Sequence, residues 1–177
     1  MKRSANLFAA LSRFARAEAG VSTVEFTIVF PLVLSVLLTS IDAGITQLRQ
    51  TFLHRAVDLS VREVRLGNVS ESARMSELIC ERTSLLPSCL QNITVEMRPI
   101  DTQTFSGLDA PVQCINREQA ITPAVFNTGV ERDLMLIKVC IVAEPFIRLN
   151  AFISQLPINA EGQYVLVSNS VFVNEPR

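Results

Sequence analysis

One segment near the N-terminus constrains this chain more than any other: the predominantly apolar run of residues 21–41, whose single ionisable side chain is Glu25. Its 21 residues match the roughly 20 that an α-helix needs to cross the hydrocarbon core of a membrane. A charged group inside such a segment costs roughly 2.5–3.5 kcal/mol at the helix centre, so it usually has a partner and a function. The run therefore predicts a transmembrane helix in which Glu25 has a specific role.

A partner for Glu25 can be generated from the chain itself. Cleavage after Gly20 would turn Val21 into a new N-terminus, whose α-amino group is mostly cationic at neutral pH. Glu25 lies four residues further on, about one helical turn deeper. Within one chain, or between neighbouring chains in a bundle, the carboxylate would neutralise that amine where the dielectric constant is low and the attraction strong. We therefore interpret Gly20, Val21 and Glu25 as one processing and assembly site.

The order of these residues resembles the processing site of type IVb prepilins: Gly20, four residues, Glu25-Phe26, then an apolar run containing Pro31. The segment is most similar to the TadE/TadF pseudopilins of the tight-adherence (Tad, Flp) pilus system, whose Val-Glu-Phe-Ala…Pro core reads here as Val24-Glu25-Phe26-Thr27…Pro31. The resemblance covers residues 13–44. Thr27 stands where an alanine is more usual, and Asp42 stands near where the family often has glutamate.

This resemblance implies a minor pseudopilin that takes part in assembling an adhesive pilus. A prepilin peptidase would cut after Gly20 and read Val21, Glu25 and Phe26. The implied partners are that peptidase, other pilins and pseudopilins of the Tad system, the inner-membrane assembly platform and membrane lipid. The implied location is the bacterial inner membrane, crossed once, with a cytoplasmic N-terminus and a periplasmic C-terminal domain; whether the subunit enters the pilus stays open.

The charge distribution agrees with this orientation. Residues 1–20 carry four basic residues against Glu18, a net charge of +3, while the rest carries twelve basic and sixteen acidic residues, a net charge of −4. Because positive segments stay in the cytoplasm, the C-terminal part is predicted to lie across the membrane. Outside residues 1–20 no basic cluster occurs, so nucleic acid is not an expected partner.

Two other interpretations remain open from the sequence. The chain could be an unprocessed signal anchor for a periplasmic binding or scaffolding module, with Glu25 reaching the membrane interface. It could also be a secreted protein with a conventional signal peptide. That second alternative fits poorly, because cleavage after Ala43 would leave Ile41 where a small residue is required.

The helical pattern continues beyond the apolar run. Residues Ile41, Ile45, Leu48, Phe52, Ala56 and Leu59 recur at spacings of three and four, and Val57, Val61 and Val64 widen this stripe. Gly67 follows as a C-cap. We therefore expect one helix over residues 21–66, kinked at Pro31, with a transmembrane half (21–42) and a periplasmic half (43–67) that packs on a head domain. The alternative is two helices separated by a break at residues 42–44.

The remaining residues, 68–177, predict an α+β head. Asn68 to Glu71 resembles a capping box opening a short helix to about Thr83. Alternation predicts a half-buried strand at 93–98, and apolar runs predict a central strand at 134–143 and a last strand at 164–173. Residues 101–129 read as a long loop, and Pro145 to Pro157 could bound a short helix. The expected fold is pilin-like: a long kinked N-terminal helix on a small, mainly antiparallel sheet with short extra helices.

The four cysteines, Cys80, Cys89, Cys114 and Cys140, all lie in the segment predicted to be translocated. An even number in an oxidising compartment indicates two disulfides, with three possible pairings. Cys80 with Cys89 is favoured because the intervening segment is short and turn-rich, which leaves Cys114 with Cys140. Neither metal-ligand spacing nor a phosphate-binding loop is visible, and His54 is expected to be a solvated surface residue. The sequence predicts no catalytic residue, cofactor or metal, and hence no enzyme.

Overall fold

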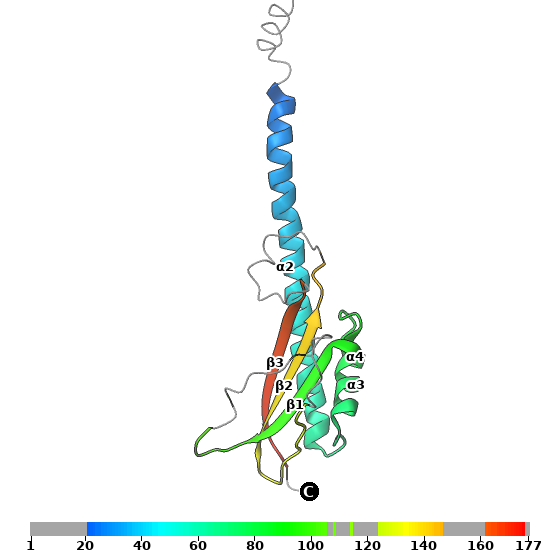
Figure 1. The fold of residues 1–177 in the computed structure, drawn as a ribbon, viewed down its shortest axis with the longest axis vertical. Coiled ribbons are helices and arrows are strands. Elements are labelled where there is room, and N and C mark those ends of the chain that lie inside the picture. Colours follow the sequence, from blue (N-terminus) through cyan, green and yellow to red (C-terminus); the bar gives the residue numbers. More distant parts are fainter. Residues whose placement is uncertain (1–20, 106–107, 109–113, 115–123, 147–161, 176–177) are drawn as a thin grey trace, which may run out of the picture. The chain divides into compact units, whose positions relative to one another are not determined.

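The computed structural model describes residues 21–105, 108, 114, 124–146 and 162–175. Its helices are α2 (Val21–Arg65), α3 (Ser72–Arg82) and α4 (Cys89–Asn92), and its strands are β1 (Ile93–Ile100), β2 (Leu134–Ala143) and β3 (Tyr164–Val173), as Figure 1 shows. The predicted α+β class is confirmed. The chain divides into two compact units, Met1–Ser40 and Ile41–Arg177, and α2 contributes to both. The predicted cytoplasmic leader peptide, residues 1–20, and most of the predicted helix at 145–157 lie outside the described residues.

Helix α2 is continuous over 45 residues, which excludes the alternative of a break at residues 42–44. Its end is set by Gly67, as predicted. Gly67 has a φ of +76°, its N–H donates to the carbonyl of Val64, and the N–H of Asn68 donates to that of Glu63. This is the Schellman arrangement, in which a left-handed residue satisfies the last carbonyls of a helix. Pro31 lies inside α2, and the kink there stays a prediction.

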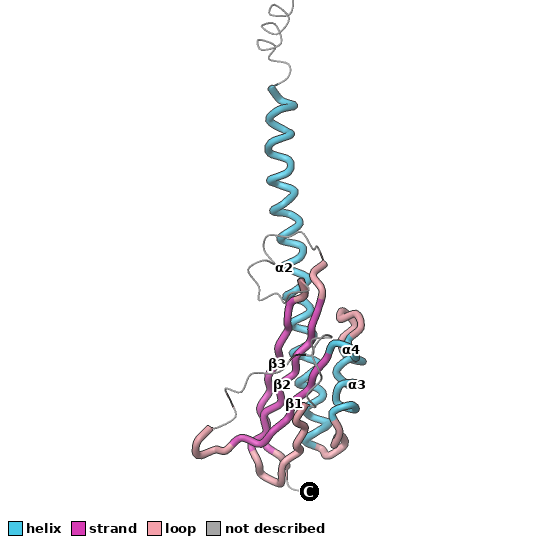
Figure 2. Tube along the Cα trace, viewed as in Figure 1, coloured by secondary structure: helices cyan, strands magenta, loops and turns pink. Residues whose placement is uncertain are grey.

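The three strands form one antiparallel sheet in the order β1-β2-β3 (Figure 2). The register runs from Ile93 opposite Ile141 to Ile100 opposite Leu134, and from Leu134 opposite Val173 to Ala143 opposite Tyr164. Strand β2 is therefore central, which confirms the prediction drawn from its unbroken apolar sequence.

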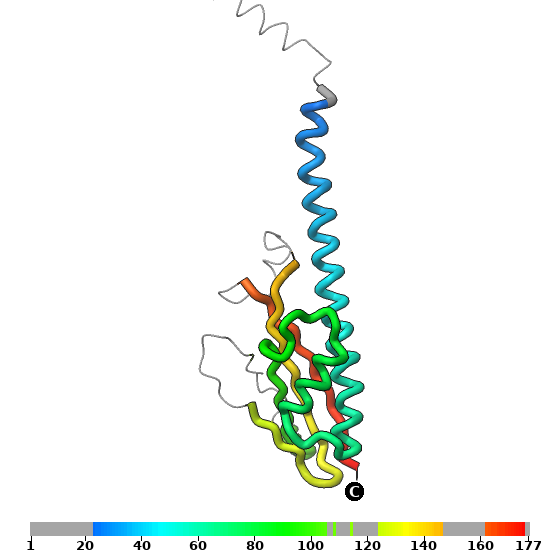
Figure 3. Tube along the Cα trace, turned by 90° about the vertical axis from the view of Figure 1, so that its right-hand side faces the viewer, coloured from blue at the N-terminus to red at the C-terminus, as the bar shows by residue number. Residues whose placement is uncertain are grey.

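One face of the sheet packs on α3 and on the part of α2 that follows Ile41. The core joins Leu53, Val57 and Val64 of α2 and Ile79 of α3 to the inward side chains of the strands, which include Ile137. In Figure 3, β2 and β3 run alongside this part of α2. The alternating side chains of the strands thus meet the helical stripe across one apolar layer.

The stripe that α2 buries is not the one that the sequence predicted. Ala56, Val57, Val61 and Val64 are buried as expected, but Ile41, Leu48 and Leu59 are exposed. The buried face centres instead on Leu53, Ala56 and Ser60. Ala56 and Ser60 have short side chains, so the sheet can approach the helix closely along this line, whereas Leu48 and Leu59 lie outside it.

Strand β1 is more buried than the predicted half-buried strand. Thr94 and Glu96, on the face away from the helices, are buried together with the apolar residues between them. On the same outer face, the ammonium of Lys138 donates to the carbonyl of Leu108 and Cys140 is bonded to Cys114. The segment after β1 thus contacts the outer face of the sheet, a tertiary effect that alternation within one strand cannot reveal.

The predicted capping box before α3 is wrong. The N-cap of α3 is Glu71 rather than Asn68, and its side chain makes no capping hydrogen bond. The Asn68 amide donates instead to the carboxylate of Glu63. Because Asn68 belongs to the C-terminal cap of α2, it cannot also begin the next helix.

Candidate functional site

The N-terminal part of α2 is the first candidate site, because its apolar side chains have no cover from the chain. From Val24 to Leu37 the large hydrophobic residues are exposed, among them Phe26, Phe30 and Leu32. The rings of Phe26 and Phe30 stack at a centroid distance of 5.1 Å, one helical turn apart. An apolar surface of this extent requires lipid or other helices around it. Helix α2 is long and apolar enough to cross a membrane once.

The polar side chains of this segment divide into two kinds. The hydroxyls of Thr27, Ser35, Thr39 and Ser40 each donate to a backbone carbonyl of the preceding turn, so they need no partner in lipid. Glu25 is different: its carboxylate is exposed and forms no hydrogen bond or salt bridge with any described residue. Glu25 is thus available to a partner outside the described residues.

The structure describes only some of the predicted processing residues. Val21 and Phe26 lie with Glu25 on α2, whereas Gly20 lies outside the described residues. Cleavage after Gly20 therefore stays a prediction. Pro31 lies five residues beyond Phe26; because proline has no N–H, the carbonyl of Thr27 lacks its usual partner within the helix.

A second polar group, missed by the sequence reasoning, lies in the head. Asp42 was expected where the chain leaves the membrane, yet its side chain is only 1% exposed and accepts a hydrogen bond from the N–H of Phe146 at 3.2 Å. Seven residues further along α2, the guanidinium of Arg49 donates to the carbonyl of Glu144 and to the hydroxyl of Tyr164. The two side chains thus fix the segment that follows β2 against α2.

This pair had a signal in the sequence that was not used. Residues seven apart lie on the same face of a helix after two turns. Asp42 and Arg49 are therefore on one face, and Leu53, Ala56 and Ser60 continue the same line. A charged pair in line with small and apolar residues indicates buried polar anchors rather than solvent-facing charges.

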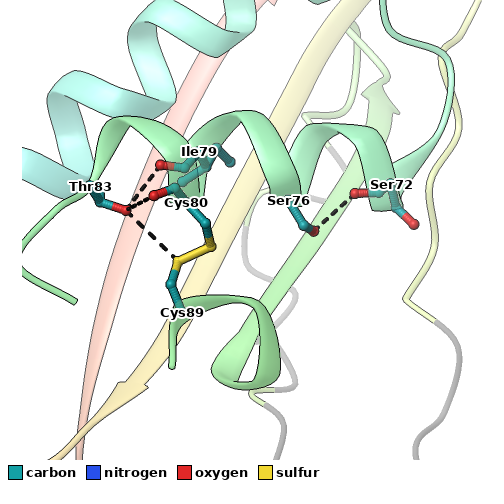
Figure 4. Close-up of a disulfide and its surroundings, with 6 residues drawn as sticks. All are labelled: Ser72, Ser76, Ile79, Cys80, Thr83 and Cys89. Carbon is teal, nitrogen blue, oxygen red and sulfur yellow. Dashed lines mark hydrogen bonds between the residues drawn. A yellow bond between two sulfur atoms is a disulfide. The ribbon is translucent and has the colours of Figure 1, made fainter. Parts of the chain in front are cut away.

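The disulfides are Cys80–Cys89 and Cys114–Cys140, the same pairs that the sequence favoured. The first joins the last turn of α3 to the start of α4 (Figure 4). Beside it, the hydroxyl of Thr83 donates to the carbonyl of Ile79 and lies 3.8 Å from the sulfur of Cys89. The second joins Cys114 to the centre of the outer face of β2. Each disulfide closes a loop and so lowers the conformational entropy of the unfolded chain, which favours the folded state.

The head offers little that resembles catalytic chemistry. His54, expected to be solvated, has its Nδ1 2.7 Å from the hydroxyl of Ser168 and its Nε2 2.6 Å from the amide nitrogen of Gln50. Ser168 is buried, whereas His54 is exposed to solvent, as expected. Among the residues that the structure describes, no group of three or more potential metal ligands occurs.

The described structure thus defines a class: an α+β head preceded by one apolar helix that is a candidate single membrane span. Residues 20–62 match the family model of TadE-like proteins, so this part of the chain is TadE-like. The resemblance inferred from Gly20, Glu25 and Pro31 is confirmed over these residues. No curated protein and no solved structure matches the chain.

Proposed function

We propose that this chain is a minor pseudopilin that a prepilin peptidase cuts after Gly20 and that takes part in assembling a Tad-type adhesive pilus. The observation that carries the proposal is the TadE-like match, which begins at residue 20 and includes Glu25 and the whole apolar run of residues 21–41. The exposed apolar surface of α2 and the unpartnered carboxylate of Glu25 support it, because both need neighbouring molecules.

In this mechanism, cleavage changes both the anchor and the charge of the helix. Removal of residues 1–20 takes away a segment of net charge +3, which would otherwise hold the N-terminus in the cytoplasm. The same cut creates the amine of Val21. When such helices bundle, Glu25 pairs with the amine of a neighbour and thereby sets the axial register between the two helices. A single buried polar contact fixes register in coiled coils in the same way.

The head acts on the periplasmic side as the part that other components recognise. Its partners are other Tad pilins and pseudopilins and the inner-membrane assembly platform. The two disulfides hold the segments around Cys89 and Cys114 in place, and they require an oxidising compartment such as the periplasm.

N-terminal sequencing of the protein recovered from cells tests the proposal directly. Processing after Gly20 gives a chain that starts at Val21. A chain that still starts at Met1 would mean an unprocessed anchor with a tethered periplasmic module, and a start near Gly44 would mean secretion of a soluble head. Either of those two results rejects the pseudopilin function.

The role of Glu25 is tested separately with Glu25→Ala, with Thr27→Ala as the matched control on the same helix. Glu25→Ala should lower co-purification with other pilins of the system by about tenfold or more, the loss of about 1.4 kcal/mol or more. Thr27→Ala should have little effect, because its hydroxyl bonds only within the helix. If Glu25→Ala is still processed and binds other pilins as before, the carboxylate does not set register.

A further inference from the structure

The part of α2 within the head carries a second apolar face that the head does not use. Opposite the buried line, Leu48, Leu59 and Leu66 are 53%, 46% and 58% exposed, and Ile41 is 45% exposed. Ile45 and Phe52, partly buried, lie between them on the same face. We call residues 41–66 of this face the outer seam; its apolar members are Ile41, Ile45, Leu48, Phe52, Leu59 and Leu66.

The spacing of the outer seam is that of a coiled coil. From Ile41 the seam positions follow at intervals of 4, 3, 4, 3, 4, 3 and 4 residues and end at Leu66. This is an unbroken heptad pattern in which Ile45, Phe52, Leu59 and Leu66 take the a positions. Such regularity keeps a seam facing one partner helix over its whole length, which scattered surface leucines would not do.

Two of the d positions are occupied by arginines, Arg55 and Arg62. Both are exposed, and neither forms a salt bridge or hydrogen bond with any residue that the structure describes. Their neighbours Arg65 and Arg82, by contrast, pair with Glu175 and Glu63. Two cations in an apolar seam, without an ion pair among the described residues, are complementary to a partner that supplies negative charge.

We propose that the outer seam is the docking site for a parallel α-helix of a different protein chain, with carboxylates at the two d positions that meet Arg55 and Arg62. A second copy of this chain does not fit, because parallel pairing places d against d and would put arginine against arginine at two successive layers. Like charges in contact are destabilising, whereas a carboxylate in each layer would pair with the guanidinium.

The placement of the carboxylates at d positions also fixes the direction of the partner. In a parallel pair the d layers meet each other, so carboxylates seven residues apart on the partner face Arg55 and Arg62. In an antiparallel pair the same carboxylates would meet the a positions, where Phe52, Leu59 and Leu66 would surround them. An ionised group without a partner in such surroundings is costly, so the parallel orientation is favoured.

The seam lies entirely within residues 41–66, so this inference goes beyond the proposed function and does not depend on cleavage after Gly20. The test uses the full-length chain in lipid nanodiscs and two fluorescent synthetic helices of four heptads. Both probes have leucine at a and isoleucine at the other d positions; one has glutamate and the other lysine at the two d positions that face Arg55 and Arg62.

Fluorescence anisotropy should show the glutamate probe binding at least about tenfold more tightly than the lysine probe, a difference of about 1.4 kcal/mol. The variant Arg55→Glu/Arg62→Glu should reverse this preference, and far-UV circular dichroism checks that it is folded. A matched control, Arg74→Glu, changes an exposed arginine on α3 and should leave the preference unchanged.

Equal binding of both probes, or binding of neither, would overturn the proposal. So would a stable dimer of the wild-type chain that Leu59→Glu dissociates, since the seam would then hold a second copy. Because the chain used still carries residues 1–20, failure here leaves the proposed processing and pilus function untouched, and failure of processing leaves this result valid.

Discussion

Asp42 and Arg49 show, at the scale of single residues, how the head holds its backbone. Both are charged and both are buried, and each binds backbone of the segment 144–146, through the N–H of Phe146 or the carbonyl of Glu144. A buried charge is tolerated where hydrogen bonds replace water. These two side chains therefore act as fixing points for the residues that follow β2.

Replacing Asp42 should loosen this segment. Asp42→Leu removes the acceptor of the Phe146 N–H and should cost about 1.5–3 kcal/mol of stability, the net contribution of a hydrogen bond to a charged group. Hydrogen exchange on the full-length chain should show faster exchange of the Phe146 amide. Asp42→Asn keeps an acceptor oxygen and should lose less; equal losses in the two variants would mean that this hydrogen bond does not hold the segment.

Asp101 gives a prediction about pH. The N–H of Gln103 donates to its carboxylate at 2.8 Å and the hydroxyl of Thr104 donates at 3.0 Å, and these contacts lower the pKa of Asp101 below the usual value for aspartate. Because the folded pKa is lowered, the contribution of this turn is fully present above the usual aspartate pKa and is lost as the pH falls through the folded value. The amide shift of Gln103 in NMR should titrate at that lowered pKa; an unshifted midpoint would contradict the structure.

At the scale of elements, the sequence predicted the bounds of the helices and strands better than it predicted which face of each element is buried. The bounds of β2 and β3 and the end of α2 follow from apolar runs and from Gly67, which are local signals. The buried face of α2 was mispredicted because the helix has two apolar stripes and only the sheet selects between them. The burial of Thr94 and Glu96 likewise depends on a segment that follows β1 in the chain.

Substitution of the glycine inside α2, Gly44, and of the glycine that caps this helix, Gly67, should change the stability in opposite directions. Gly67→Ala places a side chain at a φ of +76° and should destabilise the head by about 1 kcal/mol. Gly44→Ala lies inside α2, where an added methyl group meets nothing within 4 Å, and should stabilise by about 0.5–1 kcal/mol. Thermal unfolding of the full-length chain in detergent, followed by circular dichroism, measures both. If Gly67→Ala is neutral or stabilising, Gly67 does not cap the helix.

At the scale of the whole molecule, the N-terminal charge pattern and the disulfides both predict the side of the membrane on which the head lies. The apolar helix and the net charge of +3 on residues 1–20 predict that the head lies across a membrane from the N-terminus, and the two disulfides require an oxidising compartment. In the bacterial cytoplasm reductants would keep Cys114 and Cys140 as thiols. The redox state of the cysteines therefore reports the side of the membrane on which the head lies.

Inverting the charge of the leader should consequently leave the cysteines reduced. Replacing Lys2, Arg3, Arg13 and Arg16 with glutamate changes the net charge of residues 1–20 from +3 to −5 and should retain the head in the cytoplasm. Thiol alkylation followed by mass measurement should then find four free thiols in the membrane-bound variant and none in the wild type. The charge-preserving control, with Arg3, Arg13 and Arg16 replaced by lysine, should remain oxidised. Oxidised cysteines in the glutamate variant would mean that the charge of the leader does not set the orientation. The head would then have reached the oxidising side of the membrane without that positive charge.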